Sequence, residues 1–437
     1  MQRSIETVAV LGAGTMGAGI AAACAAAGSR VHLLDLDAGR VAEVIGRMTE
    51  GRAPLLDDPA AAGRISAGSL DDLSVLADCD WICEAVVEDL AIKQTLFRRV
   101  EEARKNGSIV TTNTSGIPLR DLANGMPERF RRDVAVTHFF NPVKVMRLLE
   151  LVPGAETDDD TLAALRAYCS ANLGKGVVLA KDTVNFIGNR IGCYWILAGL
   201  HQARAALEGG LSMETVDALM SAPVGLPATG LYGLVDLIGL DVMDLVGKNL
   251  AANLPAGDPG LACAAFPPAE QAMLERGQLG RKSGGGFYRV TKRDDGSKLK
   301  EVFDLRDQAW RVADEVTLAA PHTEAGALLF ADTPEGRFAW QLMGGTLCYA
   351  ADLVPEISDS VVGVDRAMRW GFNWQQGPFE LLDALGPDRV IARLEAEGKA
   401  LPRMLAVLRD AGATGFYRNG GAECLGPDGQ WQAVEPE

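Results

Sequence analysis

The first part of the chain alternates short β-rich apolar runs with helical stretches. From Ile5 to about Asp182 the candidate strands are Thr7–Leu11, Arg30–Leu34, Trp81–Val86, Ile109–Thr112 and Val134–Phe139. Strands that alternate with helices predict a mostly parallel, doubly wound sheet with helices on both faces. The segment 37–69 predicts a largely helical insertion, which is either a set of substrate contacts or a solvated helical hairpin.

Helical periodicity dominates beyond Asp182. It predicts helices over 186–208, 213–221 and 231–250. The glycine-rich run 283–286 closes this part, and the charged stretch 291–300 begins a predicted linker that reaches about Glu324. We therefore expect an all-α domain after the sheet domain.

The last part of the chain repeats motifs of this helical part. The motif VDALM (216–220) recurs as VDRAM (364–368), GLYGLVDLIG (230–239) as GPFELLDALG (377–386), and GFYR (286–289) as GFYR (415–418). The predicted fold is a Rossmann-type α/β domain at 1–183, a helical domain at 184–290, a linker at 291–324 and a degenerate helical copy at 325–437. Two tandem copies that pack together predict a monomer with an internal pseudo-twofold axis, or a weak homodimer.

Composition and charge exclude several classes of function. The 437 residues are 48% hydrophobic with a formal net charge of -16, which disfavours nucleic-acid or anionic membrane surfaces. The eight cysteines form no Cys-x-x-Cys pair and no metal-ligand spacing, so we expect buried thiols and no metal. A strand that begins by Ile5 leaves no room for a secretory signal, and we expect a cytoplasmic protein.

A glycine-rich turn follows the first predicted strand. Gly12, Gly14 and Gly17, with Thr15 and Met16 between them, fit the dinucleotide fingerprint, and an Ala-rich helix follows. The second strand ends at Asp35, where an acid accepts hydrogen bonds from the adenosine ribose and repels a 2′-phosphate. These residues predict an oxidoreductase that binds NAD rather than NADP.

The chain has four histidines, and one of them ends a predicted strand. His138 lies at the carboxyl edge of the sheet, where ligands bind in such folds, and Glu150 follows in the extended run Leu148–Val152. An imidazole oriented by a carboxylate is a good general base for a hydroxyl group. On these residues alone, a strand-end histidine beside an unrelated glutamate is the alternative.

Five motifs in order give a family resemblance. GAGTMG, AVVED with a lysine five residues after its glutamate, TNTSG, HFFNPVKVMRLLE and KDTVNFIGNR are similar to the 3-hydroxyacyl-CoA dehydrogenases of fatty-acid β-oxidation. The resemblance covers essentially the whole chain, because longer members carry a second helical copy. It implies NAD-dependent oxidation of an (S)-3-hydroxyacyl-CoA to the 3-ketoacyl-CoA.

The resemblance also assigns roles to individual residues. It implies His138 as base with Glu150 as its partner, Ser115 and Asn189 as contacts of the reacting group, Glu88 and Asn141 as NAD contacts, and Lys93 as a contact of a substrate or cofactor phosphate. Arg40, Arg47 and Arg52 are further candidates for the CoA phosphates.

Some residues depart from the family pattern. Gly336 stands in the second copy where Asn189 stands in the first, which predicts a scaffold without a second active site. Gly116 and Val184-Asn185 also differ from the residues of relatives, so the sequence does not determine the shape of the acyl pocket. The alternatives are a dehydrogenase of a hydroxy acid without CoA, such as a sugar acid or carnitine, or the dehydrogenase part of a larger bifunctional hydratase.

Overall fold

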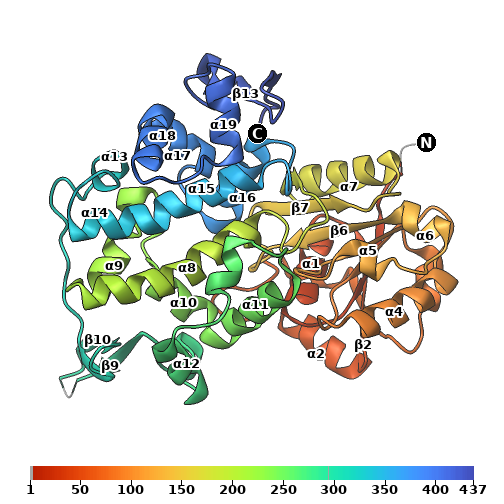
Figure 1. Ribbon diagram of the computed structural model, residues 1–437. Helices are drawn as coiled ribbons and strands as arrows, with labels where there is room; N and C mark the ends of the chain where they lie inside the picture. The colour runs from red at the N-terminus through yellow and green to blue at the C-terminus, as the bar shows by residue number, and fades with distance from the viewer. Residues whose placement is uncertain (1–2, 294) are drawn as a thin grey trace. The chain divides into compact units, whose positions relative to one another are not determined.

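The structure, a computed structural model, describes residues 3–293 and 295–437 and consists of two compact units (Figure 1). The first unit ends at Phe186 and also includes Glu437, and the second covers Ile187–Pro436. The two predicted helical copies both fall within the second unit.

An eight-stranded sheet in the order β3-β2-β1-β4-β5-β6-β7-β8 forms the centre of the first unit. All neighbouring strands are parallel except β6 and β7. The chain order reverses direction between β1 and β4, and α/β sheets bind ligands beyond the carboxyl ends of the strands at such a point. The strands are β1 (Thr7–Leu11), β2 (Arg30–Asp35), β3 (Ile65–Ser69), β4 (Trp81–Glu84), β5 (Ile109–Thr112), β6 (Val134–Phe139), β7 (Leu148–Pro153) and β8 (Gly176–Leu179).

Helices cover this sheet, and the first of them follows the glycine turn. Eight of the twelve residues of α1 are Ala or Gly, so it packs closely on β1 and β2, and its buried face joins Val8, Val10 and Val31 in the core. The helices are α1 (Thr15–Ala26), α2 (Ala38–Arg47), α3 (Pro59–Ala62), η1 (Ser74–Asp78), α4 (Leu90–Ala103), α5 (Leu119–Leu122), α6 (Glu128–Asp133) and α7 (Asp159–Ala171). The mostly parallel sheet with covering helices confirms the predicted fold class.

The segment 37–69 is only partly helical. It contains α2 and α3 as predicted, but it ends in β3, which pairs in parallel with β2 at the edge of the sheet. The polar residues Ser66 and Ser69 hide this strand in the sequence, because an edge strand buries little apolar surface.

The second unit is mainly helical. Helix α8 lies beside α14 and α15, so the two copies pack along their long helices (Figure 1). The first copy contains α8 (Gly188–Glu208), α9 (Met213–Leu219), η2 (Ala222–Val224), α10 (Tyr232–Ile238), α11 (Leu240–Asn253), η3 (Pro259–Cys263), α12 (Pro268–Glu275) and η4 (Arg281–Ser283). The second contains α13 (Ala325–Leu328), α14 (Pro334–Ala339), η5 (Trp340–Gly344), α15 (Gly345–Leu353), α16 (Val361–Phe372), α17 (Pro378–Leu385), α18 (Pro387–Ala396), α19 (Arg403–Asp410) and η6 (Asn419–Gly421).

The single helix predicted over 231–250 is two helices. α10 ends before Gly239, whose φ of 104° breaks the helical conformation, and α11 begins directly after it. Glycine adopts a positive φ at little energetic cost, so the chain turns at Gly239 while the apolar pattern of the sequence continues. None of the helices formed by the described residues is long and apolar enough to cross a membrane.

Each copy ends in a three-stranded antiparallel sheet that the sequence analysis did not predict. The first sheet is β9 (Tyr288–Lys292), β10 (Lys298–Asp304) and β11 (Ala309–Val312), and the second is β12 (Tyr417–Arg418), β13 (Glu423–Leu425) and β14 (Trp431–Ala433). Arg289 pairs with Glu301 at 2.8 Å and stacks on Trp310 at 4.1 Å. Arg418 pairs with Glu423 at 2.9 Å and stacks on Trp431 at 4.2 Å. The linker predicted at 291–324 was therefore wrong up to about residue 312, because these residues belong to the first copy.

The repeated motifs also make matching hydrogen bonds. The Tyr288 hydroxyl donates to Asp217 at 2.8 Å, and the Tyr417 hydroxyl donates to Asp365 at 2.6 Å. Amide groups at the start of α10 and α17 donate to the same two aspartates. The repeat in sequence is thus a repeat of one stabilising network.

Candidate active site

The glycine turn between β1 and α1 leaves space for a ligand. Gly12 has a φ of +106°, and a Cβ atom there would lie 2.5 Å from the Ala85 carbonyl oxygen. A Cβ atom at Gly17 would lie 1.8 Å from the Gly12 carbonyl oxygen, so the helix start packs directly on the turn. Gly14 faces open space, and no side chain caps the first amides of α1. These amides and the helix dipole are available to a pyrophosphate group.

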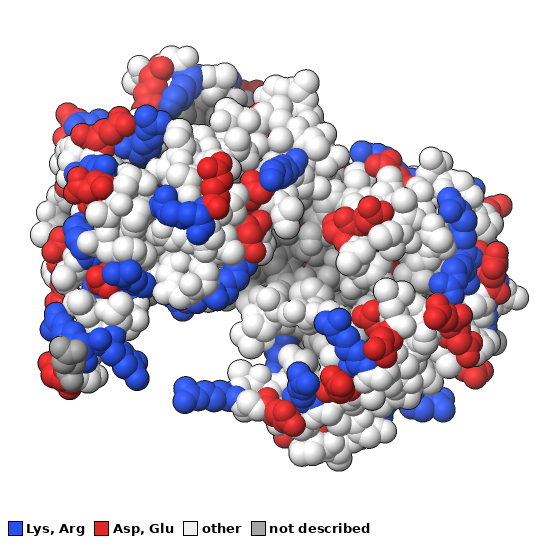
Figure 2. All heavy atoms as spheres, turned by 90° about the horizontal axis from the view of Figure 1, so that it is seen from below, with Lys and Arg blue, Asp and Glu red and all other residues white. Residues whose placement is uncertain are grey.

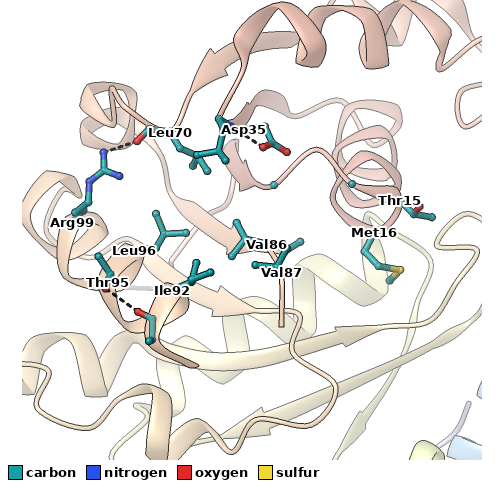
Figure 3. Close-up of a pocket in the computed structure, with 15 residues that line it drawn as sticks. Thr15, Met16, Asp35, Leu70, Val86, Val87, Ile92, Thr95, Leu96 and Arg99 are labelled. Atoms are coloured by element: carbon teal, nitrogen blue, oxygen red, sulfur yellow. Dashed lines mark hydrogen bonds between the residues drawn. The ribbon is translucent and has the colours of Figure 1, made fainter. Parts of the chain in front are cut away.

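A cavity of about 760 Å³ opens beside this turn (Figure 3). Asp35 lies at its edge, where its Oδ2 accepts the Ala13 amide at 2.6 Å and its Oδ1 accepts the Leu36 amide at 2.7 Å. A carboxylate has about four acceptor sites, so Asp35 keeps capacity for ribose hydroxyl groups. The lining residues are Gly12, Gly14, Thr15, Met16, Asp35, Leu36, Leu70, Ala85, Val86, Val87, Ala91, Ile92, Thr95, Leu96 and Arg99.

The sequence analysis did not predict the residues that form the apolar side of this cavity. Val86 and Ile92 come from the loop after β4 and the start of α4, which the fold brings opposite the glycine turn. Arg99 closes the far end, where its guanidinium donates to the Leu70 carbonyl at 2.5 Å (Figure 3). The available signal was their place after a central strand, at the carboxyl edge of the sheet.

Strands β6 and β7 place the candidate base and its partner opposite each other. Their antiparallel register pairs His138 with Glu150, and Nδ1 of His138 lies 2.6 Å from Oε2 of Glu150. Both side chains are buried, and the imidazole packs edge-on against Phe140 and beside Phe186. A carboxylate at Nδ1 holds the proton on that nitrogen and leaves the lone pair of Nε2 as the acceptor.

The Nε2 atom of His138 faces Ser115. The Ser115 hydroxyl lies 3.1 Å from it, and Ser115 itself is exposed. Glu150, His138 and Ser115 thus form one line of hydrogen bonds that ends at an accessible hydroxyl. This is the geometry of a general base with an oriented imidazole.

Glu88 fixes the turn that carries Ser115. Its Oε1 accepts the Thr114 hydroxyl at 2.5 Å, the Ser115 amide at 3.0 Å and the Gly116 amide at 3.2 Å. Burial alone raises the pKa of Glu88, but Lys93 and these hydrogen bonds lower it below its ordinary value. Besides the predicted NAD contact, Glu88 therefore has a structural partner in the site.

Lys93 lies in a different environment from the one that its predicted phosphate contact needs. Its side chain is 1% exposed, and its ammonium group lies 2.7 Å from Glu84 and 3.3 Å from Glu88. Glu84, which the sequence analysis missed, also accepts the Thr112 hydroxyl at 2.6 Å. The structure therefore favours Lys93 as a buried tie between two carboxylates, one of which holds the Ser115 turn.

The two remaining predicted residues, Asn141 and Asn189, lie in different units. Asn141 is exposed directly after β6, at the same carboxyl edge as His138. Asn189 belongs to the other unit, in the first turn of α8. In the second copy Gly336 takes its position, and a Cβ atom there would lie 2.3 Å from the Ala331 carbonyl oxygen. The second copy therefore has no room for a matching amide.

Other candidate groups have local partners. His32 bonds to Ser66, His201 to the Ala265 carbonyl and His322 to Thr333. Among the residues that the structure describes, no three His, Cys, Asp or Glu side chains are grouped to hold a metal ion. His138 is thus the histidine whose surroundings suit a base.

Comparison with known proteins agrees with this geometry. Residues 7–183 match the family model of the 3-hydroxyacyl-CoA dehydrogenase NAD binding domain, and residues 186–290 match the model of its C-terminal domain. A probable 3-hydroxyacyl-CoA dehydrogenase of Bacillus subtilis is 34% identical over 100% of this chain and 58% of its own length. A putative fatty acid oxidation complex trifunctional enzyme of Rickettsia felis is 34% identical over 89% of this chain and 54% of its own length.

A solved structure shares most of the fold. The 3-hydroxybutyryl-CoA dehydrogenase of Escherichia coli is 25% identical, with a TM-score of 0.70 over 93% of this chain and 98% of that chain. The chain spans somewhat more than half the length of the two curated relatives, at 58% and 54%.

Proposed function

Since the chain belongs to the 3-hydroxyacyl-CoA dehydrogenase family, we propose that it oxidises an (S)-3-hydroxyacyl-CoA to the 3-ketoacyl-CoA with NAD. The observation that carries this proposal is the line of hydrogen bonds from Glu150 through His138 to Ser115. It lies at the carboxyl edge of the same sheet whose first strands form the dinucleotide turn.

The proton transfer follows from this line. Ser115 donates to or accepts from the substrate hydroxyl at C3, and Nε2 of His138 takes the proton as that hydroxyl becomes a carbonyl. Glu150 stabilises the imidazolium, because its carboxylate lies 2.6 Å from Nδ1. Bound NAD would supply the hydride acceptor at C4 of its nicotinamide. The apolar rings of Phe140 and Phe186 beside His138 limit the access of water on that side.

Three further residues have proposed roles that rest on the family resemblance, and the role proposed for Lys93 rests on its ion pairs with Glu84 and Glu88. Asn189 contacts the reacting acyl group, Asn141 and Glu88 contact NAD, and Lys93 acts by positioning Glu88. Gly12, Gly14, Gly17 and Asp35 hold the pyrophosphate and the ribose of the cofactor.

The test measures NADH oxidation that depends on acetoacetyl-CoA. We expect His138→Ala to lower kcat/KM by about 10²–10⁴-fold, the usual contribution of general acid–base catalysis. His32→Ala is the matched control, because His32 lies in the same sheet and bonds only to Ser66 among the partners described. Full activity of His138→Ala would refute the proposed mechanism. Activity on a 3-hydroxy acid but not on its CoA thioester would refute the proposed substrate class.

We also propose that the second helical copy replaces a partner subunit. Gly192 of α8 packs so closely on the second copy that a Cβ atom there would lie 2.2 Å from the Phe372 ring. Arg190 is buried and donates to the Tyr349 hydroxyl at 2.6 Å. Light scattering after gel filtration should give the mass of one chain, and a stable dimer at micromolar concentration would contradict this proposal.

A cytoplasmic location is proposed as well. All eight cysteines are free and seven of them are buried, which suits a reducing compartment. Fractionation of cells that produce the tagged chain tests it, and recovery from an extracytoplasmic fraction would be the contrary result.

A further inference from the structure

A second cavity lies wholly within the second unit, between the first helical copy and its sheet. Its volume is about 1150 Å³. It is lined from α9, α10, the turn at Arg281, strands β9 and β10, and the segment 312–317. None of its lining residues belongs to the candidate active site described above.

Three cations line this cavity without an ion pair. Arg281, Lys298 and Lys300 form no salt bridge with any residue that the structure describes. The Lys300 ammonium lies 4.4 Å from the centre of the Tyr288 ring, at the cavity wall. Burial raises the pKa of Asp236, and the charges of Arg281 and Lys300 offset part of this rise, so their positive potential reaches the floor of the cavity. These groups are available to an anion.

The carboxylates of the floor, in contrast, are already satisfied. Glu214 is held by Arg311 at 2.7 and 2.9 Å. Asp217 accepts the Tyr232 amide and the Tyr288 hydroxyl, and Asp236 accepts the Phe287 and Tyr288 amides. Burial raises the pKa of Asp217 to about 7 and that of Asp236 to about 6, which reduces their negative charge near neutral pH. The other acids of the lining are Asp314, which is exposed and lies 3.5 Å from Arg311, and Glu315.

The second copy provides an internal comparison at the corresponding motif positions. Ala218, Ser221 and Gly233 line the cavity in the first copy. Their counterparts in the repeated motifs are Arg366, Arg369 and Glu380. Arg369 and Glu380 form an ion pair at 3.3 Å. The first copy therefore has small residues at three positions where the second copy has large charged side chains, two of which form an ion pair.

The hairpin of the first copy is also longer. Arg289 and Glu301 pair across β9 and β10 with 11 residues between them, whereas Arg418 and Glu423 pair with 4 residues between them. The extra residues include Lys298 and Lys300. The first copy thus combines an open cavity with cations that the second copy does not have.

We propose that this cavity binds a phosphorylated ligand of nucleotide size, with its phosphate groups at Arg281, Lys298 and Lys300. Lysine and arginine are the residues that bind phosphate in proteins. The opposite wall carries Asp314 and Glu315, which accept hydrogen bonds from ribose hydroxyl or base amino groups. The volume of about 1150 Å³ lies slightly above the range of about 300–1,000 Å³ that is typical of small-molecule and cofactor sites, so a ligand of nucleotide size has room. A nucleotide has phosphate groups for the cationic wall and hydroxyl or amino groups for the acidic wall, whereas inorganic phosphate matches the cationic wall alone.

The test titrates ADP calorimetrically into the full chain saturated with NADH, so that the dinucleotide site is occupied. We expect one further ADP site, with adenosine and pyrophosphate each binding more weakly. Lys298→Ala/Lys300→Ala should weaken ADP binding at least about tenfold, since two charged contacts are lost. Ser221→Arg/Gly233→Glu, which copies the second repeat, should abolish it. A Cβ atom at Gly233 meets no atom closer than 3.7 Å, so the fold admits this substitution.

Lys292→Ala/Arg293→Ala is the matched control, because both residues lie in the same hairpin but do not line the cavity. Its ADP affinity should change less than about twofold, as expected for exposed charges screened by salt. The proposal is overturned by absence of ADP binding to the NADH-saturated chain. It is also overturned if both alanine pairs weaken binding equally, or if binding persists in the lysine double variant. Circular dichroism verifies that each variant is folded. If Ser221→Arg/Gly233→Glu is unfolded, the ADP affinity of Lys298→Ala/Lys300→Ala decides the test alone.

Discussion

Replacement of Lys93 by Met distinguishes a buried structural tie from a phosphate contact. The Lys93 side chain is 1% exposed and Glu84 is fully buried, with 2.7 Å between their charged atoms. Loss of one partner of such a pair leaves an uncompensated buried charge and costs about 3–5 kcal/mol. That energy corresponds to a rise of roughly 10²–10⁴-fold in the opening of this part of the first unit.

Hydrogen exchange of peptides from β4 and α4, read by mass spectrometry, measures this opening. Lys105→Met is the control, because the Lys105–Asp80 pair is partly exposed and is worth less than about 1 kcal/mol. Glu84→Gln/Lys93→Met should recover most of the protection, since the double change removes both charges and keeps an acceptor for Thr112.

Hydrogen exchange responds to a structural role of Lys93, whereas the affinity for NADH responds to a phosphate contact. Loss of a direct phosphate contact would weaken NADH by about 10–100-fold, from the 1.5–3 kcal/mol of a charged hydrogen bond. We expect less than about threefold at a temperature where the variant is folded, together with a lower kcat because Glu88 no longer holds Ser115 in place. Unchanged protection of β4 with a large loss of NADH affinity would refute the structural reading of Lys93.

Three further predictions concern other parts of the chain. Gly17→Ala should abolish NADH binding, because its Cβ atom would lie 1.8 Å from the Gly12 carbonyl oxygen; retained binding by fluorescence titration would contradict the packing argument. Asp217 has a folded pKa of about 7, above its unfolded value, so its stabilising contribution is present at low pH and is lost as pH rises through about 7. Asp217→Asn should therefore reduce the pH slope of the second unit's unfolding free energy by about one proton between pH 4 and 7, and an unchanged slope in urea melts would contradict this. Gly192→Ala should cost about 1–3 kcal/mol by overpacking against Phe372, which differential calorimetry measures, and an unchanged Tm would show that the two copies are loosely packed.

Part of the site was predictable from local signals. The fingerprint at Gly12, Gly14 and Gly17 and the acid at Asp35 need only residue type and spacing, because the turn geometry itself demands glycine. His138 and Glu150 are twelve residues apart along two extended runs, and the antiparallel register of β6 and β7 places them opposite each other. Their partner Ser115 came from a family resemblance, since its strand-end position alone does not distinguish it from a turn residue.

Other features were not predictable, because they depend on contacts between distant segments. The sheet β9–β11 overlaps the predicted linker, because its charged residues show no strand pattern in the sequence and Arg289 and Glu301 pair only in the folded sheet. The break at Gly239 was invisible within a continuous apolar pattern. The cavity lined by Ser221 and Gly233 exists only in the folded chain, because its walls come from segments as distant as α9 and residues 312–317.

The sequence by itself determined the alternation of the central strands with helices in the first unit, the dinucleotide turn and the existence of a tandem repeat, because local periodicity and short motifs carry each of these. The tertiary structure alone decided what the charged groups do. Lys93 is a long, flexible cation that suits a phosphate equally well, and only the fold buries it between Glu84 and Glu88. The physical reason is that burial and pairing decide the role of a charge, and both depend on how strands and helices pack rather than on residue type and spacing.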